Sequence, residues 1–295
     1  MIHRAATLGR GPDRQGVPRK VQEPSDHALA ADAAQHRRRI LIGLCGVAVV
    51  TLSAPTSSRE LYPGIIGDDD RVRVDHRGAP WNAIGQVNVG GYRRVSRCTG
   101  TLIAPDLVLT AAHCVIDPRR RVPFPLHDIH FLIGVRGGEN RGHSTAKCLH
   151  FAAGYEFAPK DTFPIAPAQE VPLRDLATDI VEIVLNDKLE VDPVAIAERV
   201  DPHPGLSLVH AAYPADKRLV LSAHFGCQLL HFNLKRLLWF NDCDTHPASS
   251  GGPLLMKIGG VLQLAAIMVA TGKRTSNVAV PISAVKDSTR DRACP

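Results

Sequence analysis

The sequence predicts an all-β protein with one short C-terminal helix, arranged as a β-sandwich or a pair of β-barrels. From about Gly78 onward, apolar runs of strand length recur between Gly, Pro, Asn and Asp residues, and most of their members are β-branched or aliphatic. No long segment repeats apolar residues at helical spacing except 281–293. The chain has 295 residues, of which 44% are hydrophobic, so it can bury one large core or two small ones.

Nine runs form the predicted strands, and a further apolar strand follows Gly251 and Gly252. Short runs at this spacing, separated by turn residues, are typical of sandwiches and barrels. The nine runs are AIGQVNV (83–89), CTGTLIA (98–104), LVLTAAHC (107–114), DIHFLIGV (128–135), DIVEIVL (179–185), LSLVHAA (206–212), RLVLSAHFGC (218–227), VLQLAAIMVA (261–270) and NVAVPI (277–282).

Three segments precede the first predicted strand. Residues 1–35 are polar and show no sustained period, so we expect them to be disordered. Residues 36–55 resemble an export signal, either a cleaved signal peptide or an uncleaved anchor. A triple arginine there precedes an apolar run of 15 residues at 40–54, shorter than the roughly 20 residues that span a bilayer as a helix. Residues 56–77 lead into the strands.

The net charge of +6 does not by itself indicate nucleic-acid binding. Nine basic and five acidic residues fall within 1–60, so four of the six net charges lie in a segment that signal cleavage would remove. We expect a periplasmic or secreted protein with no nucleic-acid partner, and a membrane contact only if the N-terminal segment is uncleaved. A nucleic-acid or membrane-surface protein acting through Arg37, Arg38 and Arg39 stays open until the mature N-terminus is sequenced.

The stretch CTGTLIAPDLVLTAAHCV, residues 98–115, presents a candidate general base. His113 follows two alanines at the end of an apolar strand and precedes Cys114, and Cys98 lies sixteen residues before Cys114. A disulfide between these cysteines would tie the preceding strand to the turn that carries the imidazole. Rigid presentation matters because a general base must hold its nitrogen within about 3 Å of the nucleophile's proton.

A candidate nucleophile lies at Ser250, which begins the sequence S-G-G-P ahead of an apolar strand. Two consecutive glycines let the backbone turn sharply and let substrate approach closely. The amides around the serine can point at a developing oxyanion. The motif alone is also compatible with an ordinary turn, but the histidine motif favours a nucleophile.

Together the two motifs resemble the trypsin-like, or chymotrypsin-fold, serine peptidases. The family signature T-A-A-H-C matches completely at 110–114, and G-D-S-G-G-P matches in part at 250–253. The likeness extends from about Ile66 to Ile282 and is similar to the bacterial branch that contains the glutamyl endopeptidases. It implies two antiparallel β-barrels and a Ser-His-Asp triad. The N-terminal barrel would occupy 78–200, and the C-terminal barrel with its helix 201–295.

The resemblance requires an acid between the histidine and the serine, because the chain order in this family is His, Asp, Ser. The stretch TDIVEIVLNDKLEVDPVAIA, residues 178–197, resembles the family's D-x-A-x-L-x-L segment, and we choose Asp179, directly ahead of the strand. Its role would be to accept the N–H of His113, fix the tautomer and stabilise the imidazolium. Asp175, four residues earlier, and Glu182, within the strand, are the alternatives.

Two residues just ahead of the serine depart from the family pattern. Ser249 stands where trypsin has the aspartate that binds a newly cut N-terminus, so we infer that this switch does not activate the protein. Ala248 stands where the family has a glycine whose N–H forms the oxyanion hole with that of Ser250. If the position needs a positive φ, alanine costs roughly 1 to 2 kcal/mol, and outright loss of one donor costs about 100- to 1000-fold in rate.

The resemblance also places a specificity pocket. Thr245, five residues before Ser250, falls at the base of the family's pocket, and AAIMVATG, residues 265–272, supplies a wall. Glutamyl endopeptidases have a histidine in that wall, and the nearest match in this sequence is Met268. Without an acid at the base or a histidine in the wall, we expect a preference for an apolar or small side chain.

The remaining cysteines complete the predicted disulfides, since an even number in an exported chain favours pairing. Cys227 and Cys243 lie sixteen residues apart and bracket the approach to the serine, so we pair them. Cys148 and Cys294 follow by elimination. The sequence has no C-x-x-C pair and no H-E-x-x-H motif, so we expect no metal site.

These observations predict an exported serine endopeptidase that hydrolyses protein or peptide substrates through an acyl-enzyme, with no metal or organic cofactor. The alternative is a binding protein that keeps the fold but is catalytically weak or inactive because of Ala248. An α/β-hydrolase is excluded, because its triad ends in histidine and no histidine follows His246.

Overall fold

The structure is a computed structural model that describes residues 64–90, 96–156, 172–235, 237–272, 275–283 and 294. The expectations for 1–35 and 36–55, and most of the helix predicted at 281–293, lie outside these residues.

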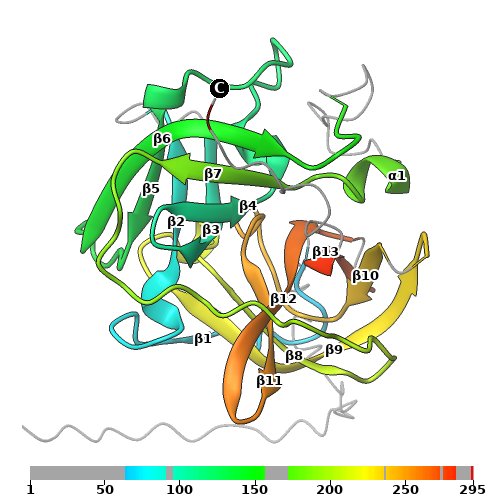
Figure 1. Ribbon diagram of the computed structural model, residues 1–295. Coiled ribbons are helices and arrows are strands. Elements are labelled where there is room, and N and C mark those ends of the chain that lie inside the picture. Colours follow the sequence, from blue (N-terminus) through cyan, green and yellow to red (C-terminus); the bar gives the residue numbers. More distant parts are fainter. Residues whose placement is uncertain are drawn as a thin grey trace, which may run out of the picture. The chain divides into compact units, whose positions relative to one another are not determined.

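The first half of the described chain forms a closed antiparallel barrel, drawn in cyan and green in Figure 1. Its strands are connected in the order β2-β3-β4-β7-β6-β5. They are β2 (Ile84–Val89), β3 (Ser96–Ala104), β4 (Leu107–Thr110), β5 (Ile129–Ile133), β6 (Gly142–Phe151) and β7 (Val181–Leu185).

The second half forms another barrel of six antiparallel strands, in the order β9-β10-β13-β12-β11-β8, which the pairing of β8 with β9 closes. A two-residue strand, β1 (Val72–Arg73), adds to β9. The six strands are β8 (Ser207–Ala212), β9 (Ser222–Asn233), β10 (Leu238–Asn241), β11 (Pro253–Ile258), β12 (Val261–Ala270) and β13 (Asn277–Pro281). The prediction of an all-β protein built of two barrels is therefore confirmed.

Between the strands, the described residues form only short helical turns. One α-helical turn, α1 (Leu173–Leu176), precedes β7. The 3-10 turns are η1 (Trp81–Ala83), η3 (Ala112–Val115), η4 (Leu126–Asp128) and η5 (Ala215–Lys217). Two of them, η3 and η5, lie at the candidate site.

Three strands of the structure are absent from the predicted runs: β1, β6 and β10. In β6 the inward-facing residues include Ser144, Ala146 and Cys148, which are small, so the strand carries little of the apolar alternation that identifies a buried face. β10 is only four residues long and follows Leu234 and Lys235, both at positive φ. Pairing with neighbouring strands, rather than local sequence, makes these segments β-strands.

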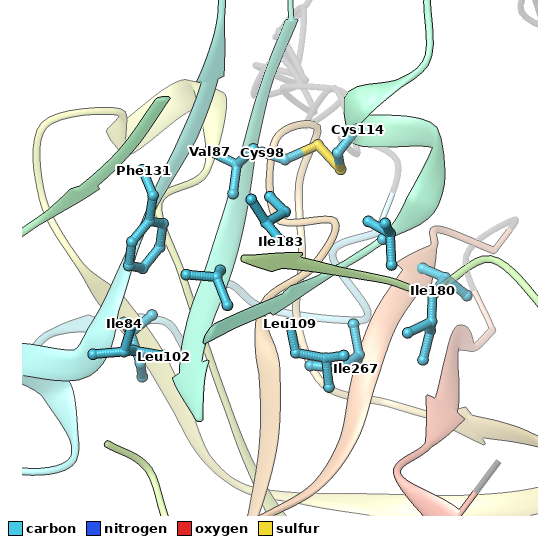
Figure 2. Packing of buried hydrophobic residues seen from close by; sticks show 14 of the residues in the cluster. Ile84, Val87, Cys98, Leu102, Leu109, Cys114, Phe131, Ile180, Ile183 and Ile267 are labelled. Carbon is cyan, nitrogen blue, oxygen red and sulfur yellow. A yellow bond between two sulfur atoms is a disulfide. The ribbon is translucent and has the colours of Figure 1, made fainter. Parts of the chain in front are cut away.

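One cluster of buried apolar side chains extends from the N-terminal barrel into the C-terminal barrel. It includes Leu109 and Ile183 of the first and Ile267 of the second (Figure 2). At its centre in the first barrel, the fully buried ring of Phe131 lies over Gly85 and Gly100. A Cβ atom at either glycine would approach the ring to 2.7 or 3.1 Å, so the two glycines make room for it.

Three disulfides link the described cysteines: Cys98–Cys114, Cys148–Cys294 and Cys227–Cys243. The first joins β3 to η3, and Figure 2 shows it beside the core. Several disulfides in one chain are typical of extracytoplasmic proteins. Among the residues that the structure describes, no helix is long and apolar enough to span a bilayer.

Replacing Phe131 by alanine tests the packing of the N-terminal barrel. Because the ring is fully buried, Phe131→Ala should lower the free energy of unfolding by about 3 to 5 kcal/mol in urea titrations. The control is Val261→Ala in β12, whose side chain is 58% exposed and which should cost less than about 1 kcal/mol. Equal effects of the two substitutions would contradict the packing described here.

Candidate active site

His113 sits in η3, one short turn after β4 ends at Thr110. The next residue, Cys114, is fully buried and bonded to Cys98 of β3. The turn is therefore fixed both by the chain leaving β4 and by a covalent bond to the neighbouring strand. The imidazole side chain itself stays 30% exposed, so it is held at its base and accessible at its tip.

Asp179 contacts His113 in two ways. Its Oδ2 atom lies 2.6 Å from His113 Nδ1, and its Oδ1 atom accepts the main-chain N–H of His113 at 2.8 Å. An ionised carboxylate only accepts hydrogen bonds, so Nδ1 carries the proton and Nε2 is left as the free acceptor. Asp179 is 6% exposed and lies between α1 and β7.

This contact sets the protonation of the imidazole. Burial lowers the pKa of His113, but the adjacent Asp179 carboxylate opposes that effect and holds the pKa above its ordinary value of 6.5. The two alternatives for the acid are placed elsewhere: Asp175 pairs with Arg174 within α1, and Glu182 is a buried residue of β7 opposite Leu109.

The loop that carries Ser250 is bound to β3 through Thr99, which is fully buried. The N–H of Thr99 donates to the carbonyl oxygen of Ser250 at 2.8 Å, and its hydroxyl donates to the carbonyl oxygen of Ala248 at 3.1 Å. The same hydroxyl accepts the N–H of Tyr213 at 3.0 Å, while Thr110 donates to the carbonyl oxygen of Thr99 at 2.7 Å. The N–H and the hydroxyl of Thr99 therefore join the two barrels, while its carbonyl oxygen is bound within the first.

Gly251 lets the loop approach this closely. It has a φ of +82°, and a Cβ atom there would lie 2.0 Å from both Thr110 Oγ1 and the Thr99 carbonyl oxygen. Its N–H donates to the carbonyl oxygen of Met268 at 2.7 Å, which attaches the loop to β12 as well. Only glycine fits here, because any side chain would meet backbone and a buried hydroxyl.

The two amides expected to bind an oxyanion are available. Pro247 turns its carbonyl away to accept the N–H of Ala215 at 2.7 Å, so the N–H of Ala248, on the same trans peptide, points to the opposite side. Within the described residues, neither the Ala248 nor the Ser250 N–H donates to another protein group. Ala248 has a φ of +75°, so this position does need the left-handed conformation.

Ser249 fills the position of the missing aspartate with neutral hydrogen bonds. Its N–H donates to the carbonyl oxygen of His246 at 2.9 Å, and its hydroxyl accepts the N–H of His246 at 3.2 Å. The side chain is buried within this turn. The turn before Ser250 is thus closed on itself without an acid.

The turn that carries His113 contacts the loop of Ser250 through Cys114. Cys114 Sγ lies 3.9 Å from the carbonyl oxygen of Ser250. In the described part of the chain, no hydrogen bond joins the Ser250 hydroxyl to the imidazole. Such bonds are often long before substrate binds and shorten in the reacting complex.

The two predicted pocket residues are both buried. Thr245 donates its N–H to the carbonyl oxygen of Gly64 at 2.9 Å, so the chain before β1 covers it. Met268 packs in a second apolar cluster with Trp239, Leu254 and other side chains of the C-terminal barrel.

Three groups of potential metal ligands contain disulfide-bonded cysteines. In a fourth, Asp70, His224 and Asp244, the Asp244 carboxylate accepts two main-chain N–H groups, and His224 Nδ1 accepts the N–H of Asp244 at 2.9 Å. Nothing in these contacts indicates a metal ion.

Residues 98–262 match the model of the trypsin-like peptidase domain. The chain belongs to the trypsin-like peptidase family. In structure it resembles a Glu endopeptidase in complex with MPD, with a TM-score of 0.60 and 22% identity over 77% of this chain and 100% of the other. It also resembles the Vibrio cholerae VesB protease, with a TM-score of 0.55 and 16% identity over 74% and 65% of the two chains. The prediction of the chymotrypsin-like fold is confirmed by these matches.

Two curated relatives match over short segments of the peptidase domain. A modular serine protease of Drosophila melanogaster is 36% identical over 67 residues, 20% of this chain and 10% of its own length. The CLIP domain-containing serine protease B15 of Anopheles gambiae is 52% identical over 42 residues, 14% of this chain and 12% of its own length. The matches therefore span about a tenth of these two relatives.

Sequence reasoning did not identify Thr99, Ala215 or Pro247 as parts of the site. Thr99 stands in the stretch C-T-G-T, which carries no catalytic signature, and the other two act through main-chain atoms. The position of Thr99 between a bridged cysteine and a glycine is the only sequence signal that could have pointed to it.

Replacing Asp179 by asparagine tests the cause of the raised pKa of His113. Asp179→Asn removes the negative charge, so the pKa of His113 should fall relative to the unmodified protein in an NMR titration of the imidazole. Asp175→Asn is the control and should leave the pKa of His113 unchanged. If the pKa of His113 falls in Asp175→Asn but not in Asp179→Asn, then Asp175 rather than Asp179 raises it, and the prediction is wrong.

Replacing Ala248 by glycine tests the strain at the left-handed position. Relief of roughly 1 to 2 kcal/mol of strain exceeds the roughly 0.5 to 1 kcal/mol that glycine costs in chain entropy. Ala248→Gly should therefore stabilise the protein by up to about 1 kcal/mol in urea unfolding. Ala177→Gly, at an ordinary φ of −68°, should destabilise it, and the same sign for both variants would contradict the argument.

Proposed function

We propose that this protein is an exported serine endopeptidase in which Ser250 is the nucleophile, His113 the general base and Asp179 the residue that orients His113. The observation that carries the proposal is the attachment of both halves of the site to consecutive residues of β3. Cys98 holds the turn of His113, and Thr99 holds the loop of Ser250. Such fixed juxtaposition is what a nucleophile and its base require.

The reaction would proceed in two acyl-transfer steps. Ser250 Oγ attacks the carbonyl carbon of the scissile bond while His113 Nε2 takes its proton, and the carbonyl oxygen becomes an oxyanion that the N–H groups of Ala248 and Ser250 bind. Collapse breaks the C–N bond, His113 gives the proton to the leaving amine, and an acyl-enzyme remains. Water then attacks the ester with His113 again as base, which releases the acid and restores Ser250. Asp179 accepts the Nδ1–H bond throughout and stabilises the imidazolium.

Protein or peptide substrates follow from family membership. We propose a preference for an apolar or small side chain, because neither Thr245 nor Met268 offers a charge to meet a basic or acidic residue. This preference would distinguish the protein from the structurally similar Glu endopeptidase.

Export is supported by the cysteines and by residues 36–55. The three disulfides need an oxidising compartment, and the arginine-flanked apolar run has the length of a signal segment. The periplasm or the cell exterior is therefore the proposed location.

The proposal is tested by labelling the folded protein with a fluorophosphonate and mapping the adduct by intact mass and peptide mass spectrometry. We expect one adduct, on Ser250, that is lost in Ser250→Ala and retained in Ser249→Ala, the matched control on the neighbouring serine. No adduct on a folded protein would overturn the proposal and favour the alternative, a binding protein that keeps the peptidase fold.

The rate of labelling should also depend on pH in a defined direction. The base must be neutral to accept the proton of Ser250, so the rate should rise as pH rises through the pKa of His113. Because Asp179 raises that pKa, the midpoint should lie above the ordinary 6.5. A midpoint below this value, or a rate independent of pH, would contradict the role of the pair.

A further inference from the structure

A buried arginine lies beside the turn that shapes the candidate oxyanion hole. The side chain of Arg71, directly before β1, is 4% exposed, yet it carries a full charge. Its guanidinium binds Asp216 of η5 through two hydrogen bonds, Nη2 to Oδ2 at 2.6 Å and Nη1 to Oδ1 at 3.1 Å. It also binds Asp69 through two, at 2.8 and 2.9 Å. Two carboxylates therefore satisfy one buried cation in a bidentate geometry.

The segment that carries Arg71 is itself fixed to the C-terminal barrel. The carboxylate of Asp244 accepts the N–H groups of Ile66 and Asp70 at 2.9 and 2.8 Å. The two residues after Arg71 form β1, which pairs with β9. Lys217 Nζ also donates to Asp69 Oδ2 at 3.0 Å. Arg71 is thus presented to η5 from a rigid base rather than from a free loop.

The other end of this ion pair leads to Ala248. Asp216 follows Ala215, whose N–H donates to the carbonyl oxygen of Pro247 at 2.7 Å. That bond keeps the Pro247 carbonyl turned away from the site, and it therefore determines where the Ala248 N–H points. A rotation of this peptide would remove one donor and direct a carbonyl dipole at the developing oxyanion.

The required orientation needs support, because alanine disfavours the left-handed conformation by roughly 1 to 2 kcal/mol. The turn around Ser249 supplies only neutral hydrogen bonds. Among the described residues, three contacts with charged groups reach η5: Arg71 with Asp216, Lys217 with Asp69 at 3.0 Å, and His246 Nδ1, which lies 3.5 Å from Asp216. The Arg71 side chain is the most buried of the three partners of η5, at 4% exposed against 12% for His246 and 34% for Asp69.

We propose that Arg71 and Asp216 are positioning residues: their ion pair holds η5 so that Ala215 fixes the Pro247–Ala248 peptide with the Ala248 N–H directed into the oxyanion hole. This inference rests on the proposed peptidase function. It gives the protein an internal, permanent substitute for the aspartate and new N-terminus that assemble the hole in trypsin.

The pKa values of Arg71 and Asp216 favour an ion pair that stays charged on both sides. Burial lowers the pKa of Arg71, but the two carboxylates outweigh it and hold the pKa above its ordinary value, so the guanidinium stays charged in alkaline solution. Burial raises the pKa of Asp216, but the hydrogen bond from Arg71 brings it below the ordinary value. A depressed carboxyl pKa contributes stability above the unfolded pKa that is lost as pH falls through the folded one.

The test compares Arg71→Met, Asp216→Asn and Arg71→Lys with the unmodified protein in kcat and KM on a peptide amide. Arg71→Met and Asp216→Asn should lower kcat by about 10- to 100-fold, because the oxyanion donor is mispositioned, while KM stays within a few-fold. Arg71→Lys, which keeps a charge, should recover part of the loss. The matched control is Arg77→Met, which breaks an ion pair of the same type with Asp75 whose side chains are 65% and 57% exposed, and should change neither constant.

Each outcome decides between two accounts. If the unmodified protein neither reacts with the fluorophosphonate nor cleaves the peptide, it is the proposed peptidase function that is overturned. If it is active and the folded variants keep its kcat, or lose activity only through KM, the positioning role is overturned. If all three variants lose their fold, judged by near-ultraviolet circular dichroism, the ion pair serves stability alone. That outcome also overturns the positioning role.

Discussion

The hydrogen bonds of Thr99 join the two barrels at the candidate site. This one buried residue of β3 donates its main-chain N–H to the carbonyl oxygen of Ser250 and its hydroxyl to that of Ala248, and the same hydroxyl accepts the N–H of Tyr213 from the opposite barrel. Its neighbour Cys98 binds the turn of His113 covalently. Consecutive residues of one strand therefore fix both partners of the proposed proton transfer.

The other residues of the site are positioned around this strand by contacts between residues that are far apart in the sequence. Asp179 reaches His113 from the start of β7, and Gly251 lies close enough to Thr99 and Thr110 that no side chain could replace its hydrogen. On the far side, Arg71 and Asp216 hold η5 against Pro247. The site thus rests on packing and backbone hydrogen bonds, which explains how it tolerates Ser249 and Ala248 at positions where trypsin-like signatures have aspartate and glycine.

The sequence predicts the two-barrel fold and the neighbourhood of His113, Asp179 and Ser250, because these residues stand in short local motifs next to recognisable strands. It does not predict β6, whose buried face is built of small residues, or the part played by Thr99, whose partners Ala248, Ser250 and Tyr213 are more than 100 residues away in the chain. Arg71 and Asp216 are 145 residues apart, and only the folded chain brings them together. The positive φ of Ala248 is likewise set by tertiary contacts rather than by local preference.

The central claim is that the loop before Ser250 holds a preformed oxyanion hole despite Ala248. A crystal structure of the protein treated with a peptidyl boronate tests it most directly. The account predicts a tetrahedral adduct on Ser250 Oγ, with one boronate oxygen within about 3 Å of the N atoms of both Ala248 and Ser250 and the Pro247 carbonyl still bound to Ala215. An adduct whose oxygens face solvent, with the Pro247 carbonyl turned into the hole, would contradict it.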